Sequence, residues 1–196
     1  MKYRLVGSEM CIRDSLYLDG TIELEMKLTG IVGISAHNEE IHNPEQDMKI
    51  TEELVSPIHQ HLFNVRIDWF LDGGKNKLIE TNAERIPIGN KNPHGTQFQA
   101  ISSHLKKESE AKRNIAPEKS RVWKITNPNK KNSIGGESAY KFLPGYSPVL
   151  LSDFDSPTGK RASFAKYNLW ATPFEKGEIS GGGRFTVCLL YTSDAA

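Results

Sequence analysis

The clearest pattern along the chain is an alternation of side chains between Ser56 and Leu71. Successive side chains of a β-strand point to opposite faces, so this alternation predicts one strand over the whole stretch. One face is apolar apart from two imidazoles at its leading end, and it carries His59, His61, Phe63, Val65, Ile67, Trp69 and Leu71. We expect the apolar members of this face to lie in a core, with Asp68 turned away from them.

The remaining pattern is also that of short strands. Residues 16–28 predict a β-hairpin around Asp19-Gly20, a dipeptide typical of a type I′ turn, followed by an alternating half-buried strand. Further strands are expected over 76–82, 120–126, 140–143 and 164–172, with loops over 37–53, 86–97 and 127–138. Residues 103–114 fit either a short helix or an extended polar arm. Many short strands between Gly/Pro turns predict an all-β fold, most simply a sandwich.

Charge changes this picture little. The 196 residues carry a net charge of +1, which predicts no general attraction to nucleic acid or to a membrane. A basic window over 104–131 holds nine Lys/Arg against three Glu, a net of +6. This window could be a polyanion-binding face, but glutamates interrupt it and Trp123 is its one aromatic residue. A solvated face is the better interpretation.

The two imidazoles suggest metal chemistry. Histidines at i and i+2 of one strand lie roughly 6.5–7 Å apart at Cα, so their rings can converge on one ion. Imidazole suits copper, zinc, iron or nickel better than magnesium. A pair of hydrogen-bonded histidines at a strand end is the simpler alternative, and the apolar run behind His59 and His61 favours the metal.

Three motifs in order resemble the copper amine oxidases, the copper- and topaquinone-dependent enzymes. They are Tyr17–Gly30, Pro57–Gly73 with its His-Gln-His, and Arg161–Ala165 followed by Leu169–Pro173. The resemblance implies a large antiparallel β-sandwich, oxidation of primary amines to aldehydes with release of ammonia and hydrogen peroxide, and a homodimer in the full-length protein. It assigns copper to His59, His61 and a third, downstream histidine.

Other parts of the implied site have no counterpart in the sequence. No histidine follows His104, and no tyrosine stands in the Asn-Tyr-Asp/Glu motif from which topaquinone forms. The catalytic aspartate would lie further upstream. A second, harder cation, usually calcium, is implied at Asp68 and the Trp69 carbonyl, although Phe70 replaces a frequent second aspartate. An ion pair between Asp68 and Arg66 is an equally good interpretation of Asp68. Glu108, or alternatively Glu110, matches a further peripheral cation site.

Both ends look foreign to this pattern. Residues 1–15 and 187–196 resemble translated sequencing-adapter sequence, and both cysteines, Cys11 and Cys188, lie in them. We therefore expect residues 16–186 to be an internal fragment of the catalytic domain, inactive by itself.

Two other classes remain as alternatives. A cupin-like metal-binding sandwich also uses His-x-His, but it requires a glutamate four or five residues later, where Val65 and Arg66 stand. A non-catalytic binding module would use the basic window, and its polyanion binding would weaken with salt.

Overall fold

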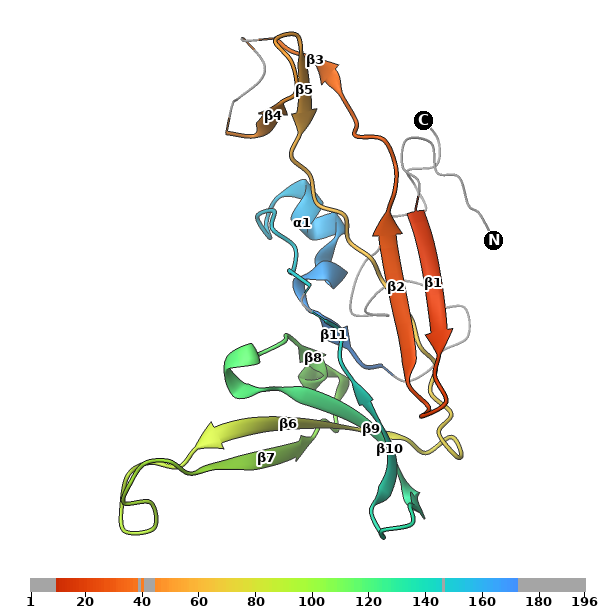
Figure 1. Cartoon of the computed structure of the whole chain (residues 1–196), viewed down its shortest axis with the longest axis vertical. Helices are drawn as coiled ribbons and strands as arrows, with labels where there is room; N and C mark the ends of the chain where they lie inside the picture. Colours follow the sequence, from red (N-terminus) through yellow and green to blue (C-terminus); the bar gives the residue numbers. More distant parts are fainter. Residues whose placement is uncertain (1–9, 39, 41–44, 146, 173–196) are drawn as a thin grey trace. The chain divides into compact units, whose positions relative to one another are not determined.

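The computed structural model describes residues 10–38, 40, 45–145 and 147–172 (Figure 1). The sequence-based expectations for residues 1–9, 187–196 and Cys188 lie outside these described residues. The chain divides into two compact units, Met1–Gln60 and His61–Ala196. The boundary falls between the two histidines of the predicted metal pair, and each unit is described by itself.

The first unit begins with the predicted hairpin. Strands β1 (Met10–Leu16) and β2 (Ile22–Leu28) pair antiparallel, with Leu16 opposite Ile22, which confirms a hairpin around Asp19-Gly20. Its first strand is formed by residues 10–16, most of which we had set aside as foreign, and not by residues 16–18. The type I′ turn is wrong, because Gly20 has a positive φ of 86° and Asp19 does not. The Gly20 amide donates to the Tyr17 carbonyl at 3.0 Å, and the Asp19 carboxylate accepts from the Thr21 amide at 2.9 Å. This is a three-residue loop that closes on a left-handed glycine.

A small antiparallel sheet follows in the order β3-β5-β4. Its strands are β3 (Ser35–Ala36), β4 (Asp47–Lys49) and β5 (Leu54–Pro57). The central strand contributes the two buried residues Val55 and Ser56. β4 lies inside the stretch that we expected to be loop.

The long strand predicted over 56–71 is wrong. β5 ends at Pro57, and the next strand begins only at Lys77. The face expected to be core is open, since Phe63 is 45%, Val65 46% and Ile67 41% exposed. Among the described strands none pairs with residues 58–70, so neither a hydrogen-bond ladder nor a facing layer covers this alternation. An alternating sequence forms a half-buried strand only where such a partner exists.

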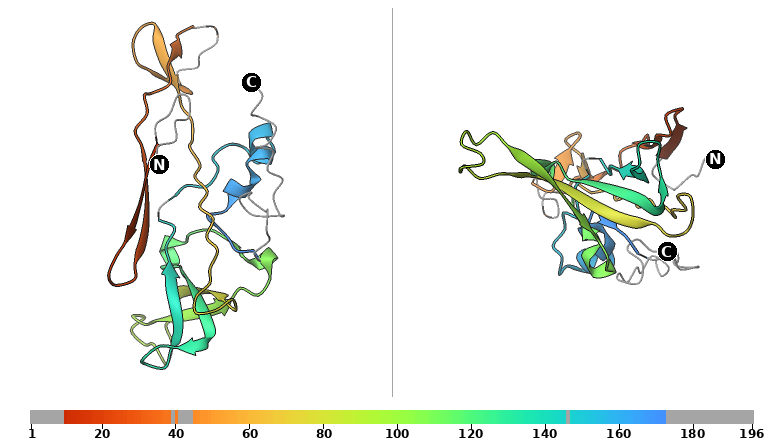
Figure 2. Two further views of the ribbon diagram at one scale, coloured as in Figure 1. Left: turned by 90° about the vertical axis from the view of Figure 1, so that its right-hand side faces the viewer. Right: turned by 90° about the horizontal axis from the view of Figure 1, so that it is seen from below.

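The second unit is built on a four-stranded antiparallel sheet in the order β10-β9-β6-β7. Its strands are β6 (Lys77–Arg85), β7 (Phe98–His104), β9 (Val122–Lys131) and β10 (Glu137–Phe142). Figure 2 shows the β6–β7 ribbon running out from the sheet to the 86–97 loop. β6 was predicted, but its partners are β7 and β9 rather than the 56–71 stretch. β7 was not predicted, and β9 continues into the expected 127–138 loop.

The core of this unit gathers around Trp123, which is 1% exposed. Leu105 and Ala111 are buried with it, and five partly buried residues surround them: Leu78, Ile115, Phe142, Leu169 and Ala171. Trp123 and Ile125 are both buried, as their shared face on β9 predicted. The apolar side chains that close this core therefore come from several elements of the sheet and its flanks.

Short elements flank the sheet. Strands β8 (Lys112–Arg113) and β11 (Leu169–Trp170) pair antiparallel. The helices are η1 (Glu108–Glu110), η2 (Pro117–Lys119), α1 (Pro157–Arg161) and η3 (Ser163–Lys166). The expected strand over 164–172 is thus partly helical. The all-β prediction is confirmed, because every strand pair in the described part of the chain is antiparallel and its one α-helix has five residues. None of the described helices has the length and apolarity needed to cross a membrane.

Candidate metal centre

His59 and His61 lie in the strandless segment that follows β5, and both are exposed. The His59 ring has a defined local partner, since its Nδ1 lies 2.9 Å from the Pro57 carbonyl oxygen. A carbonyl oxygen only accepts, so Nδ1 carries a proton, and in the neutral ring the lone pair then lies on Nε2. A hydrogen bond of this kind fixes the tautomer of metal-binding histidines. The donor chemistry of His59 therefore fits a copper ligand that binds through Nε2.

The histidine pair does not form a complete metal site with other side chains. Within the described residues, no three His, Cys, Asp or Glu side chains come together so that they could hold an ion. His37 is half-buried in the first unit, His94 and His104 are exposed in the second, and His42 lies outside the described residues. The chain thus presents an i, i+2 imidazole pair, which is two of the three histidines that the resemblance implies for copper.

The residues expected to bind a harder cation provide too few oxygen ligands for a complete site. Asp68 is exposed, and Trp69 is half-buried with its ring 5.5 Å from the Tyr140 ring. The Trp69 carbonyl accepts a hydrogen bond of 3.1 Å from Asn76 Nδ2. Glu108 opens η1 and is half-buried, while Glu110 is exposed. Calcium takes six to eight oxygen ligands, and Asp68 and Trp69 together offer only a small part of such a set.

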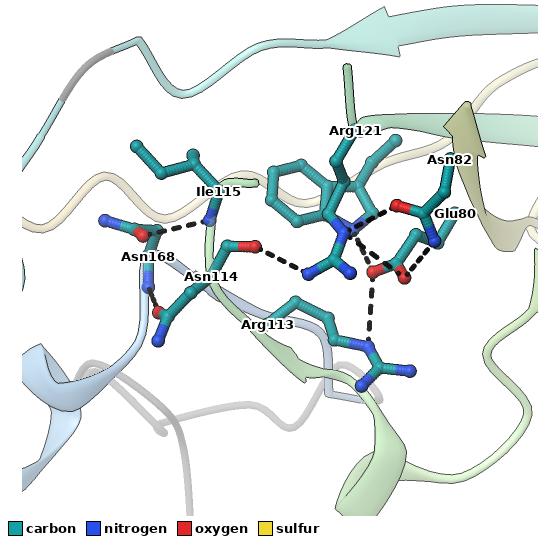
Figure 3. A network of polar contacts seen from close by, with 8 residues as sticks. Glu80, Asn82, Arg113, Asn114, Ile115, Arg121 and Asn168 are labelled. Atoms are coloured by element: carbon teal, nitrogen blue, oxygen red, sulfur yellow. Dashed lines mark hydrogen bonds and ion pairs between the residues drawn. The ribbon is translucent and has the colours of Figure 1, made fainter. Parts of the chain in front are cut away.

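The second unit contains a buried carboxylate that the sequence did not reveal (Figure 3). Glu80, with a side chain 5% exposed, lies on β6 directly opposite Trp123. Trp123 Nε1 donates to its Oε2 at 3.0 Å, and Asn82 Nδ2 donates to its Oε1 at 3.2 Å. The Arg113 and Arg121 guanidinium groups lie 3.2 and 3.4 Å from it. Each carboxylate oxygen is therefore matched by a cation and a neutral donor.

The network continues beyond the carboxylate. Arg121 donates to Asn82 Oδ1 at 2.9 Å and to the Asn114 carbonyl at 2.9 Å. Asn168 then bonds to two successive residues: its Oδ1 accepts from the Ile115 amide, and its own amide donates to Oδ1 of Asn114. Figure 3 shows these side chains bridging separate elements. Two cations of the basic window, Arg113 and Arg121, are thus committed to Glu80 rather than presented as a polyanion surface.

Comparison with known proteins decides the family. The sequence matches the family model "Copper amine oxidase, enzyme domain" over residues 9–193. The chain belongs to the copper amine oxidase family. It is 40% identical to "Histamine oxidase" of Arthrobacter globiformis over 174 residues, a match that covers 87% of the chain and 25% of that protein. It is 33% identical to "Diamine oxidase [copper-containing] 1, peroxisomal" of Nicotiana tabacum, covering 86% of the chain and 22% of that protein.

Solved structures agree with this assignment. The chain superimposes on the copper-containing benzylamine oxidase of Hansenula polymorpha with a TM-score of 0.83 and 26% identity, covering 94% of the chain and 29% of that structure. The Aspergillus nidulans amine oxidase, at 17% identity and a TM-score of 0.65, shares the fold. The chain spans about a quarter of the length of the curated relatives it matches. Family membership implies copper and topaquinone as the family's cofactors.

Proposed function

We propose that this chain supplies two copper ligands, His59 and His61, to a primary-amine oxidase. The overall reaction converts a primary amine, dioxygen and water into an aldehyde, ammonia and hydrogen peroxide. The observation that carries the proposal is the Pro57–His59 contact of 2.9 Å within the family match, because it sets the His59 tautomer for binding through Nε2.

The roles of this chain's residues follow from their chemistry. Copper, when bound, supplies the redox chemistry by which the family's quinone forms from a tyrosine. His59 and His61 contribute neutral imidazoles, which suit copper, and the Pro57 carbonyl orients the first ring. Two ligands give a weaker and more open copper site than three. We propose that sequence outside these 196 residues supplies the third ligand, the quinone tyrosine and the catalytic base.

The substrate is proposed only as a primary amine. Relatives are named for histamine, a diamine and benzylamine, and those names belong to those proteins. Dioxygen is the second substrate, and the whole protein is expected to be a homodimer. For calcium, we propose that Asp68 and the Trp69 carbonyl give two oxygens of a larger site and that Glu108 belongs to a separate one; these residues do not complete either site alone.

The test is a copper(II) titration of the purified chain by isothermal calorimetry. His59→Ala and His61→Ala should each weaken copper(II) binding at least about tenfold, because each variant loses one of the two ligands. The matched control is His94→Ala, which removes an exposed histidine from the 86–97 loop. Equal copper affinity in His61→Ala and His94→Ala would overturn the proposal.

A further inference from the structure

The segment that carries His61 runs from β5 to the turn before β6. Residues 58–70 make no ladder with any described strand. The far end of the segment is held where it approaches the four-stranded sheet of the second unit. Side-chain amides make that attachment.

Asn127 is the first of these attachments. It lies on β9 and is 2% exposed. Its Nδ2 donates to two successive carbonyls, that of Leu71 at 2.8 Å and that of Asp72 at 3.1 Å. Its Oδ1 accepts from the Asn129 amide at 2.8 Å. Donors and acceptor are all engaged, so the carboxamide has one orientation in which it fits.

Asn76 is the second attachment. Its Nδ2 donates to the Trp69 carbonyl at 3.1 Å and to the Gly73 carbonyl at 3.0 Å. The turn between these carbonyls includes Asp72, whose φ of 51° is unusual for a residue with a side chain. The Trp69 ring also packs against Tyr140 of β10. Two carboxamides thus hold the carbonyls of residues 69, 71, 72 and 73.

We propose that Asn127 and Asn76 are positioning residues that anchor the far end of the histidine segment to the sheet. This inference rests on the proposed copper function. The four carbonyls that the two carboxamides hold fix where the backbone leading back to His61 meets the sheet. Losing these bonds would let this end of the segment move and would change where His61 is presented. The two amides act through the backbone and do not touch the metal.

The test replaces each carboxamide by a carboxylate of the same shape. Asn127→Asp keeps the acceptor for the Asn129 amide and removes both donors to the segment. Asn76→Asp does the same for Trp69 and Gly73 at a half-buried position that tolerates a charge better. The control is Asn90→Asp, an exposed residue of the 86–97 loop that adds the same charge.

Two readouts are measured on chains that melt cooperatively. Copper(II) affinity should fall about tenfold in both variants and remain unchanged in the control. A tenfold fall is at the low end of the ~10–100-fold losses seen when residues that support metal ligands are replaced. Hydrogen–deuterium exchange of the metal-free chain should accelerate over residues 61–76 and stay unchanged over 98–104, which a general loss of stability would not do.

The outcomes separate this inference from the proposed function. Unchanged copper affinity and unchanged exchange in folded Asn127→Asp overturn the anchoring role, and Asn76→Asp decides in the same way if the first variant does not melt cooperatively. If copper binding of the original chain proves independent of His61, the proposed copper function has failed. The exchange result then still decides whether the amides hold the segment.

Discussion

Replacing Glu80 with glutamine should lower the free energy of unfolding of the second unit substantially, although only one oxygen is exchanged for an amide nitrogen. Glu80 is 5% exposed and faces two guanidinium groups. Glutamine keeps the shape and one acceptor oxygen but removes the charge that compensates Arg121, whose side chain is 16% exposed. Arg113 is 36% exposed, so water can solvate it and its share is small. Removing one partner of a buried pair costs about 3–5 kcal/mol, and with the discount for Arg113 we expect about 2–3 kcal/mol.

Urea unfolding followed by tryptophan fluorescence is a suitable assay, because Trp123 donates directly to Glu80. A loss of this size corresponds to a fall of about 5–10 °C in Tm. Glu84→Gln is the matched control, since Glu84 is exposed on the same strand and the same face of β6. Surface changes of this type stay within about 0.5 kcal/mol. If Glu80→Gln also stays within that range, the Glu80 network does not stabilise the sheet.

Three further outcomes are expected. The hydrogen bond from Lys77 Nζ, at 2.6 Å, lowers the pKa of Glu137 from its ordinary 4.5, so the stability it contributes is present above about pH 4.5 and is lost as pH falls through the lower folded-state pKa. Thermal melts of Glu137→Gln and the original chain should differ at pH 7 and converge once the pH has fallen below the folded-state pKa. Gly159→Ala should destabilise the region around α1, because a Cβ would lie 2.2 Å from the Asp153 carbonyl oxygen. Gly89→Ala is the control, since a Cβ there meets nothing within 4 Å, and equal melting temperatures for the two variants would contradict this prediction. The 196-residue chain loaded with copper should release no hydrogen peroxide from benzylamine and form no phenylhydrazine adduct, and a coloured adduct would show that a quinone forms within it.

Local chemistry was enough to predict part of the fold. The hairpin follows from Asp19-Gly20 between alternating runs, and β9 follows from Trp123 and Ile125 two residues apart. For both the hairpin and β9, the residues that allow the prediction lie within the element itself. The hairpin's turn type was still wrong, because Gly20 alone has a positive φ, whereas a type I′ turn requires one at Asp19 as well.

The histidine stretch shows where such reasoning stops. Its alternation describes a surface with two faces, but a strand also requires a neighbour to bond its backbone and a layer to cover its apolar side. The described strands provide neither, and Val65 remains 46% exposed. The core position that the alternation predicted for Val65 is therefore wrong, and a charged residue there is not expected to unfold the chain.

The side chains that hold the second unit together could not be found from local sequence. Glu80 meets Trp123 across 43 positions, and Asn127 meets Leu71 across 56. A glutamate on a strand is far more often solvated than buried. The tertiary pairing of β6 with β9 brings Trp123 to this carboxylate, and Arg113 reaches it from β8. The same holds for Asn127, whose role depends on a segment folding back onto β9.

The most direct test of the copper site counts the imidazoles that bind the ion. Electron spin echo envelope modulation of the chain with one equivalent of copper(II) detects the remote nitrogen of each coordinated imidazole. The original chain and His94→Ala should show two coordinated imidazoles, and His59→Ala and His61→Ala should each show one. If the number is the same in all four proteins, His59 and His61 are not the copper ligands, and the proposed role of this chain is wrong.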